Sequence, residues 1–219
     1  MRKSIQFVAQ LVLVLGVSLA HAGSYDDFFK AVKRDDGKAV TELLQRGFDP
    51  DTIDPSGRAG LFIAVQDGSL HAADALIAWP KTRVEWRSAK DESPLMIAAL
   101  RGHTELVKKL IARDADVNKP GWAPLHYAAT GGHVDIMKIL LDDYAFIDAQ
   151  SPNKTTPLMM AAKYGSTAAV KLLLDEGADA TMRNELGLSA VDFALQAQRQ
   201  DAADMIAAAI RKAQPKGKW

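Results

Sequence analysis

The chain has no cysteine among its 219 residues. It can therefore form no disulfide, and it has neither a cysteine nucleophile nor a thiolate ligand for a metal. A chain of this length buries about 70% of the surface that it exposes when unfolded, so its stability does not depend on covalent cross-links. The missing cysteine does not decide the compartment, because cysteine-free proteins occur in oxidising and in reducing compartments.

An excess of charge of either sign is missing too. The chain carries 27 basic and 27 acidic residues, and without residues 1–22, which hold Arg2 and Lys3, the balance becomes 25 against 27. Proteins that bind the phosphate backbone of nucleic acids need a concentrated basic face. We therefore expect no nucleic-acid partner.

Catalytic signatures are also missing. The chain has no Gly-x-Ser-x-Gly turn, no His-Glu-x-x-His helix and no phosphate-binding loop. Asp49, Asp51 and Asp54 loosely suggest a calcium loop, but Ile53 occupies a ligand position and no bidentate glutamate follows. The sequence thus predicts no enzyme, with no catalytic residue, no cofactor and no metal site.

The first 22 residues have the features of an export signal. Positive charge at Arg2 and Lys3 precedes an apolar run from Phe7 to Ala20, and Ala20-His21-Ala22 supplies the small residues of a cleavage site. The run has 14 residues, whereas a helix that spans a bilayer needs about 20. We expect residues 1–22 to be cleaved, which leaves no stable membrane anchor and a periplasmic or secreted protein.

At the other end, residues 214–219 are expected to form a basic disordered tail.

One spacing recurs six times along the rest of the chain. Apolar residues lie 33, 34, 30, 33 and 33 positions apart, and an alanine follows three positions after each. The pairs are Phe28/Ala31, Leu61/Ala64, Leu95/Ala98, Leu125/Ala128, Leu158/Ala161 and Val191/Ala194. A period near 33 residues indicates stacked units, none of which can bury its apolar face alone.

The fourth copy shows the unit most clearly. Pro124 suits the first turn of a helix, where its missing N–H costs no hydrogen bond. Leu125 and Ala128 share one helical face, and Gly132 can adopt the left-handed conformation that ends a helix. A second helix is predicted over Val134 to Asp142. Each unit is therefore a helix, a tight turn, a second helix and a polar connection to the next unit.

This unit resembles the ankyrin repeat. The fourth copy has Ala123-Pro124-Leu125-His126 with Gly132-His133, and Ser93-Pro94-Leu95-Met96 and Thr156-Pro157-Leu158-Met159 begin two further copies. The resemblance covers about residues 25 to 213. It implies an all-α ankyrin-repeat solenoid of about six helix-turn-helix units, with the first and last as caps and short finger loops between units. The units are expected at residues 25–53, 54–87, 88–118, 119–148, 149–181 and 182–213, in a single domain over residues 23–213.

The resemblance also implies a role for most histidines. It assigns His103, His126 and His133 to hydrogen bonds that tie helix starts and neighbouring loops together. His71 has no such assignment and is expected at an exposed helix start.

Four copies depart from the pattern. The first lacks the proline motif and has Asp26-Asp27-Phe28-Phe29 instead, as suits an opening cap. The second has Gly60 in place of proline, and its segment from Trp79 to Thr82 replaces the usual Gly-Ala-Asp. The fourth begins three residues early, so its connection through Lys119, Pro120 and Gly121 is predicted to be shortened, leaving a notch beside Trp122. The sixth lacks the turn glycine, as expected of a closing unit.

In ankyrin proteins a partner lies across the fingertips and the exposed face of the first helices. The resemblance carries this face over to a set of charged and large side chains: Arg58, Asp67, Glu92, Leu100, Arg101, Trp122, Thr130, Lys163, Tyr164 and Leu188. Aromatic and arginine side chains often dominate binding energy at such a face. Two alternatives stay open, since Trp122 could instead pack against the next finger and Tyr164 could cover its own unit.

The chain is similar to exported bacterial ankyrin proteins, and this resemblance implies a non-enzymatic, monomeric module that binds a protein. We expect an adaptor, or an accessory or protective partner, of another envelope protein. The alternative is an inhibitor or immunity-type protein that blocks one specific enzyme. A hydrolase without a recognised motif is a third alternative.

Overall fold

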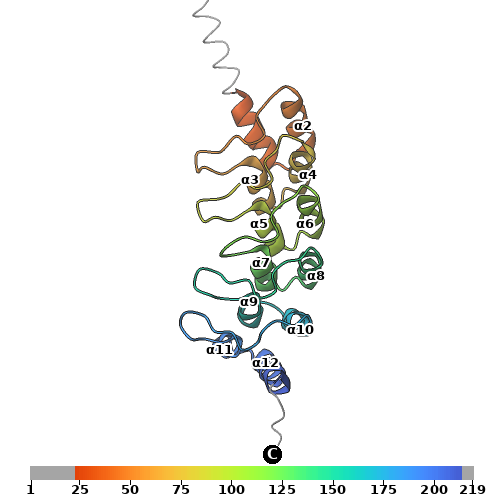
Figure 1. The fold of residues 1–219 in the computed structure, drawn as a ribbon. Coiled ribbons are helices and arrows are strands. Elements are labelled where there is room, and N and C mark those ends of the chain that lie inside the picture. Colours follow the sequence, from red (N-terminus) through yellow and green to blue (C-terminus); the bar gives the residue numbers. More distant parts are fainter. Residues whose placement is uncertain (1–22, 214–219) are drawn as a thin grey trace, which may run out of the picture. The chain divides into compact units, whose positions relative to one another are not determined.

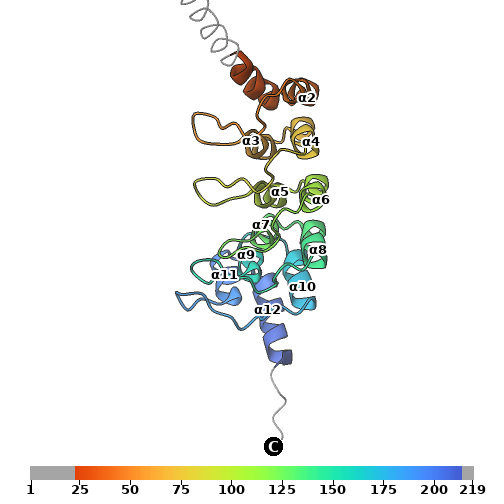
Figure 2. The same cartoon turned by 45° about the horizontal axis from the view of Figure 1, so that its top comes forward.

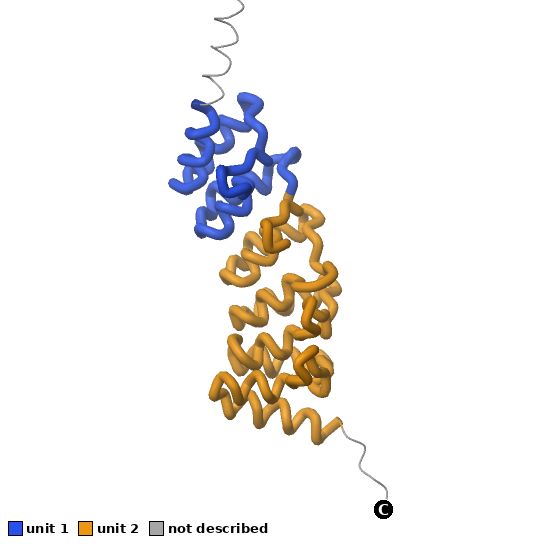
Figure 3. Tube along the Cα trace, turned by 90° about the vertical axis from the view of Figure 1, so that its left-hand side faces the viewer, with its two compact units in different colours: residues 1–83 blue, residues 84–219 orange. Residues whose placement is uncertain are grey.

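The computed structural model describes residues 23–213, so the expected export signal at residues 1–22 and the expected tail at residues 214–219 lie outside the described residues. The chain divides into two compact units, residues 1–83 and 84–219, which Figure 3 colours separately. The first unit ends just after the segment Trp79 to Thr82, the irregular stretch noted in the sequence. The single domain over residues 23–213 stays a prediction.

The first unit consists of helix pairs. Helical residues 23–33 precede helices α2 (Gly37–Gln45), α3 (Gly60–Asp67) and α4 (Leu70–Ala78). Helix α4 packs against both α2 and α3. The described core of this unit contains an aromatic cluster, in which the Phe28 ring lies 5.1 Å from the Phe29 ring and 4.7 Å from the Phe48 ring.

This cluster explains why Gly60 replaces proline in the second repeat. A Cβ atom at Gly60 would lie 2.6 Å from Cζ of Phe28, closer than real carbon contacts. Phe28 is fully buried and held by two further rings. The glycine therefore makes room for an aromatic side chain of the preceding repeat.

The second unit continues the same pattern through four helix pairs. Their helices are α5 (Pro94–Arg101), α6 (Thr104–Ile111), α7 (Pro124–Gly131), α8 (Val134–Asp142), α9 (Pro157–Lys163), α10 (Thr167–Asp175), α11 (Ala190–Gln196) and α12 (Gln200–Ala213). Within this unit α5, α7, α9 and α11 stack in one column, and α6, α8, α10 and α12 form a second column (Figure 1). The finger loops project from the side of the first column, as the turned view also shows (Figure 2). The described residues thus form six helix pairs, and the predicted all-α repeat solenoid is confirmed.

Local sequence explains where these helices begin and end. The Ser93 and Thr156 hydroxyls accept backbone N–H bonds three residues on, at 3.2 and 3.4 Å, which caps α5 and α9. Proline follows each cap in the first helical turn. Gly132 ends α7 with φ of 69°, a left-handed conformation that glycine adopts without strain. Paired buried alanines follow in the first-column helices, so that neighbouring helices approach closely: Ala98, Ala99, Ala128, Ala129, Ala161 and Ala162.

The finger loops share one closing hydrogen bond, and the fourth repeat differs. In the second unit, a backbone N–H at Ser88, Ser151 or Asn184 donates to the carbonyl four residues on, at 2.9 to 3.0 Å. Residues 115–123, which the structure describes in full, show no backbone bond of this kind. Lys119 instead pairs with the Asp91 carboxylate of the preceding finger. Residues 112–123 form the connection between α6 and α7, 12 residues against 14 between α8 and α9, so the shortened connection predicted before Trp122 is present.

The last helix has the character of a closing unit. Helix α12 buries Ala202, Ala203 and Ile206, while Asp204 and Arg211 lie exposed on its other face. This polar face agrees with the predicted terminal cap. Among residues 23–213, no helix is both long enough and apolar enough to cross a bilayer.

Candidate partner-binding face

The first column of helices in the second unit carries an apolar hollow of about 210 Å³. Helices α5, α7 and α9 supply its walls, and the shortened connection supplies its rim. The lining residues are Leu100, Trp122, His126, Tyr127, Thr130 and Met160. We call this hollow the Trp122 cavity.

Trp122 lies against a histidine of its own repeat. The two rings meet edge to face, with centroids 5.2 Å apart and planes at 73°. His126 is fully buried: its Nδ1 accepts the Ala123 N–H at 3.1 Å, and its Nε2 donates to the Thr155 carbonyl at 3.0 Å. Burial lowers the pKa of His126, so the ring is neutral near pH 7. Trp122 therefore packs against a fixed, uncharged ring of its own repeat. The alternative that Trp122 also packs against the next finger stays open.

A carboxylate lies at the finger side of the cavity. The Tyr127 hydroxyl donates to Oε1 of Glu92 at 3.3 Å, and the Ser88 hydroxyl donates to Oε2 at 3.3 Å. Burial, together with the nearby Glu92 charge, raises the pKa of Tyr127. The phenol therefore stays protonated at any physiological pH and points its O–H towards an anion.

Positive charge lies at the opposite ends of the same helices. Arg101 and Lys163 occupy the last turns of α5 and α9, where cations interact favourably with the helix dipole. The Lys163 ammonium lies 5.3 Å from the Tyr164 ring and 5.6 Å from the Phe193 ring. Tyr164 is 56% exposed, so a partner can reach it. The face combines an apolar centre with an acidic finger side and a basic helix-end side.

The predicted partner-contacting residues divide by position. Leu100, Trp122 and Thr130 line the Trp122 cavity, and Glu92 contacts it through the Tyr127 hydroxyl. Arg101, Lys163 and Tyr164 lie at the helix ends described above, and Leu188 is half-buried in the finger before α11. The structure describes where these side chains lie; their role in binding stays a prediction.

The remaining two predicted residues belong to the first unit. Arg58 donates to the Asp54 carboxylate at 3.0 and 2.8 Å and to the Gln66 side chain at 3.2 Å. These bonds fix the guanidinium within its own finger. Asp67 is exposed at the end of α3.

Sequence reasoning missed three lining residues: His126, Tyr127 and Met160. His126 was assigned only to hydrogen bonds between units. Tyr127 and Met160 occupy one repeat position, two residues after Leu125 and Leu158 respectively. That shared offset was available in the sequence and could have identified both.

His126 and His133 tie neighbouring units together, as the resemblance implied for them, while the same role for His103 stays a prediction. His126 reaches the next finger, and His133 Nε2 bonds the Leu100 carbonyl at 3.0 Å, which links two repeats. His71 differs, because it lies exposed in the first turn of α4 and pairs with Asp35 at 2.7 Å. The side-chain bond to Asp35 raises the pKa of His71.

The three aspartates that loosely suggested a calcium loop each accept hydrogen bonds from other groups of the protein. Asp49 accepts the Asp51 N–H at 3.0 Å, Asp51 accepts the Arg83 N–H at 2.9 Å, and Asp54 pairs with Arg58. Across residues 23–213 no group of three or more histidine or acidic residues is arranged to hold a metal ion.

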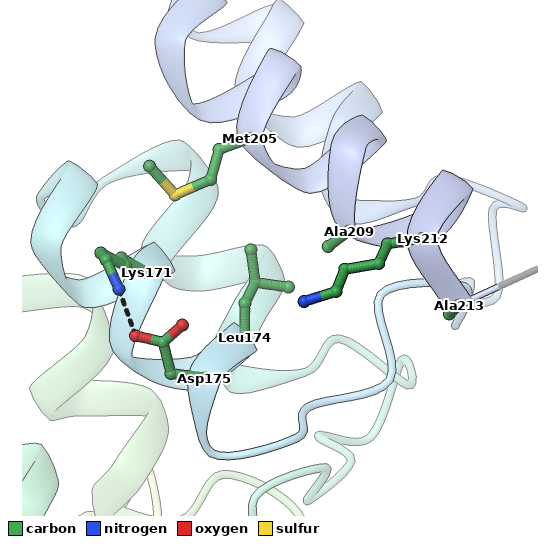
Figure 4. Close-up of a pocket in the computed structure, with 7 residues that line it drawn as sticks. All are labelled: Lys171, Leu174, Asp175, Met205, Ala209, Lys212 and Ala213. Carbon is green, nitrogen blue, oxygen red and sulfur yellow. Dashed lines mark hydrogen bonds and ion pairs between the residues drawn. The ribbon is translucent and has the colours of Figure 1, made fainter.

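A larger hollow of about 510 Å³ lies elsewhere, between α10 and α12 (Figure 4). Lys171 and Asp175 form an ion pair on the α10 side, and Met205 and Lys212 line the α12 side. Its lining extends to Ala213, the last described residue. It shares no residue with the Trp122 cavity.

Comparison with known families now identifies the repeat. One family model for ankyrin repeats in three copies matches residues 61–151, and a second for ankyrin repeats in many copies matches residues 145–194. Together the two models cover more than half of the chain. The chain belongs to the ankyrin repeat family. Ankyrin repeats form protein-binding modules, which are generally not enzymes.

Several ankyrin proteins are similar in sequence. An ankyrin repeat-containing protein of Treponema pallidum is 27% identical over 188 residues, which are 81% of this chain and 61% of that protein. The human transient receptor potential cation channel subfamily A member 1 is 35% identical over 159 residues, 68% of this chain and 14% of the channel. Mouse ankyrin repeat and SAM domain-containing protein 6 is 34% identical over 121 residues, 53% of this chain and 13% of that protein. The chain therefore spans less than two thirds of the length of each of these relatives.

Proposed function

We propose that this ankyrin protein is an exported adaptor or accessory partner that binds another envelope protein through the face around the Trp122 cavity. The observation that carries the proposal is the cavity itself, an apolar hollow rimmed by the half-buried Trp122 and flanked by opposite charges. Interfaces of this composition place aromatic and arginine side chains at their energetic centre.

The arrangement favours binding over chemistry. The buried His126 has both ring nitrogens occupied by backbone groups, so it can neither accept nor deliver a proton to a ligand in the cavity. Tyr127 holds its proton because of burial and Glu92. What remains for a partner is apolar surface, a tryptophan edge and charged rims.

The test is a variant that removes three large side chains of this face, Trp122→Ala, Arg101→Ala and Tyr164→Ala; Arg101 and Tyr164 are exposed and Trp122 is half-buried. Each contributes about 2 kcal/mol or more at a true hot spot, so capture of a partner from an envelope fraction should be lost while the melting temperature changes little. The matched control replaces Asp135 and Lys138, exposed on α8, with alanine and should capture the partner as the wild type does. Equal capture by the triple variant would exclude this face.

The effect on the activity of a captured enzyme distinguishes the two candidate roles of this protein. An adaptor or accessory protein leaves the activity of its partner intact or raises its resistance to heat or proteolysis. An inhibitor or immunity-type protein instead abolishes that activity in proportion to the complex formed. Titrating purified enzyme with the wild type and the triple variant separates these outcomes.

Export is tested independently of binding. The full chain should appear in the periplasmic fraction or the medium, with a mass that corresponds to a chain starting at Gly23. A cytoplasmic chain that retains residues 1–22 would contradict the proposed export. It would not bear on the proposed binding face.

A further inference from the structure

Two aromatic side chains project from the connection that follows α8. Tyr144 is 84% exposed and Phe146 is 68% exposed, while Ala145 between them is buried. Such exposure of two large aromatic residues so close in sequence is unusual, because each could otherwise bury about 150–250 Å² of surface. We call these two residues the Tyr144–Phe146 pair.

The other repeats place different residues at the same positions. The equivalents of Tyr144 in the second unit are Asp114 and Gly177, with φ of 60° and 91°. Tyr144 itself has φ of 63°, a left-handed conformation that glycine adopts freely and bulky residues rarely. A tyrosine here therefore does not serve the turn.

The same holds for Phe146, whose equivalents are aspartates. In the fifth repeat the Asp179 carboxylate accepts the Thr181 N–H at 2.8 Å and the Thr181 hydroxyl at 2.6 Å, which stabilises the turn. A phenylalanine cannot accept these bonds. At both positions, therefore, this repeat has an exposed aromatic side chain in place of a residue suited to the turn.

A side chain of the preceding repeat holds the pair in place. The Asn118 amide donates to the Tyr144 carbonyl at 2.8 Å, and its oxygen accepts the Phe146 N–H at 2.8 Å. In the next repeat the corresponding position is Asp148, which accepts only the Asp179 N–H. Because Asn118 has both a donor and an acceptor, it fixes the backbone of both aromatic residues, and the rings project from a fixed connection.

The surface around the pair is acidic. Exposed Asp142 and Asp143 precede Tyr144 directly. The corresponding connections of the two neighbouring repeats add further exposed carboxylates at Asp114, Glu176 and Asp179, whereas Asp116 pairs with Arg87 and Asp175 with Lys171. Arg113 is the basic residue in these three stretches, and it is half-buried.

We infer that the Tyr144–Phe146 pair and the carboxylates around it form a second binding surface, which takes a lysine- or arginine-rich segment of a protein partner. Lysine and arginine bind over aromatic faces within about 6 Å of the ring centre. Carboxylates beside the rings add ion pairs and repel acidic partners. An anionic lipid surface does not fit, since the same carboxylates would repel it.

This surface is separate from the Trp122 cavity. The pair follows α8 of the second column, whereas the cavity lies on α5, α7 and α9 of the first column. The inference therefore goes beyond the proposed function, and either can fail without the other.

The test uses a fluorescein-labelled peptide of alternating glycine, lysine and arginine as the probe, with anisotropy as the readout. The variant Tyr144→Gly/Phe146→Asn installs a residue suited to the left-handed turn and a neutral residue that can cap it. We expect this variant to bind the peptide about tenfold more weakly than the wild type, and to melt at the same or a higher temperature. Asp142→Asn/Asp143→Asn should also weaken binding and reduce its dependence on salt.

Matched controls make the outcome decisive. The triple variant at Trp122, Arg101 and Tyr164 should bind the basic peptide as the wild type does, and a glycine–glutamate peptide should not bind. Equal affinity of the wild type and Tyr144→Gly/Phe146→Asn overturns the inference. It is likewise overturned if the pair instead mediates self-association in sedimentation equilibrium, or binding to phosphatidylglycerol vesicles, without binding the basic peptide.

Discussion

Replacing His126 tests how neighbouring repeats are joined in the second unit. The wild-type ring makes two hydrogen bonds, from the Ala123 N–H and to the Thr155 carbonyl. The two adjacent repeats have methionine at this position, and the Met96 sulfur accepts the Ser93 N–H at 3.4 Å. His126→Met should therefore keep a weak version of the first bond and lose only the second.

The structure sets the size of the effect. The Thr155 carbonyl still accepts the Ser151 N–H at 3.0 Å, so its bond to His126 contributes only the net value of one hydrogen bond, about 1 kcal/mol. For His126→Ala, the buried Ala123 N–H also loses its acceptor and a cavity remains, which together raise the loss to about 3–5 kcal/mol. In a protein of this size these losses correspond to a melting temperature lower by about 2–4 °C and about 6–20 °C respectively.

Calorimetry and urea titration of the wild type and both variants measure these shifts. Adding Ala123→Ser to His126→Met recreates the capping pair of Ser93 and Met96 and should recover about 1 kcal/mol. If His126→Met and His126→Ala both melt within 1 °C of the wild type, the histidine does not join the repeats as the geometry indicates.

The pH dependence gives an independent check on the same residue. Burial lowers the folded-state pKa of His126 below the ordinary value of 6.5. Its stabilising effect is therefore fully present above pH 6.5 and declines as the pH falls towards the folded-state pKa. The difference in melting temperature between the wild type and His126→Met should shrink between pH 7.5 and pH 5.

Two further predictions concern the first unit. Gly60→Ala in α3 should destabilise the protein by about 1–2 kcal/mol despite the better helix propensity of alanine, because the new Cβ meets the buried Phe28 ring; a higher melting temperature would show that the ring moves aside freely. His71 has its pKa raised by the bond to Asp35, so its stabilising effect is present below pH 6.5 and is lost as the pH rises through the raised pKa. His71→Gln should accordingly lower the melting temperature more at pH 5.5 than at pH 8.5, and an equal effect at both values would contradict the pairing.

The repeated motif predicts most of the fold, because particular residue types mark where each helix of the repeat begins and ends. Proline in the first turn of α7 and glycine at its end mark the helix limits, and the short spacing before Trp122 predicts the missing finger closure. The steric reason for Gly60 could not be predicted, since it depends on how deeply Phe28 of another repeat reaches.

The candidate site was only partly predictable. Leu100 and Thr130 follow from the usual partner-facing positions, whereas His126 faces the Trp122 cavity only because Trp122 lies on its ring. That contact depends on the path of the shortened connection and on side-chain rotamers. Neither is encoded in residue spacing.

The shortened connection before Trp122 also has a consequence for how such a chain can diversify. The stack of α5, α7 and α9 is intact although the finger between two of these helices has lost residues. The conformational free energy of a loop changes only slowly with its length. Finger length is thus a variable that insertion or deletion can alter in a single step, changing the surface offered to a partner while every buried side chain of the stack is retained. Restoring three residues after Lys119 would alter the rim that carries Trp122 while leaving the lining residues of α5, α7 and α9 unchanged.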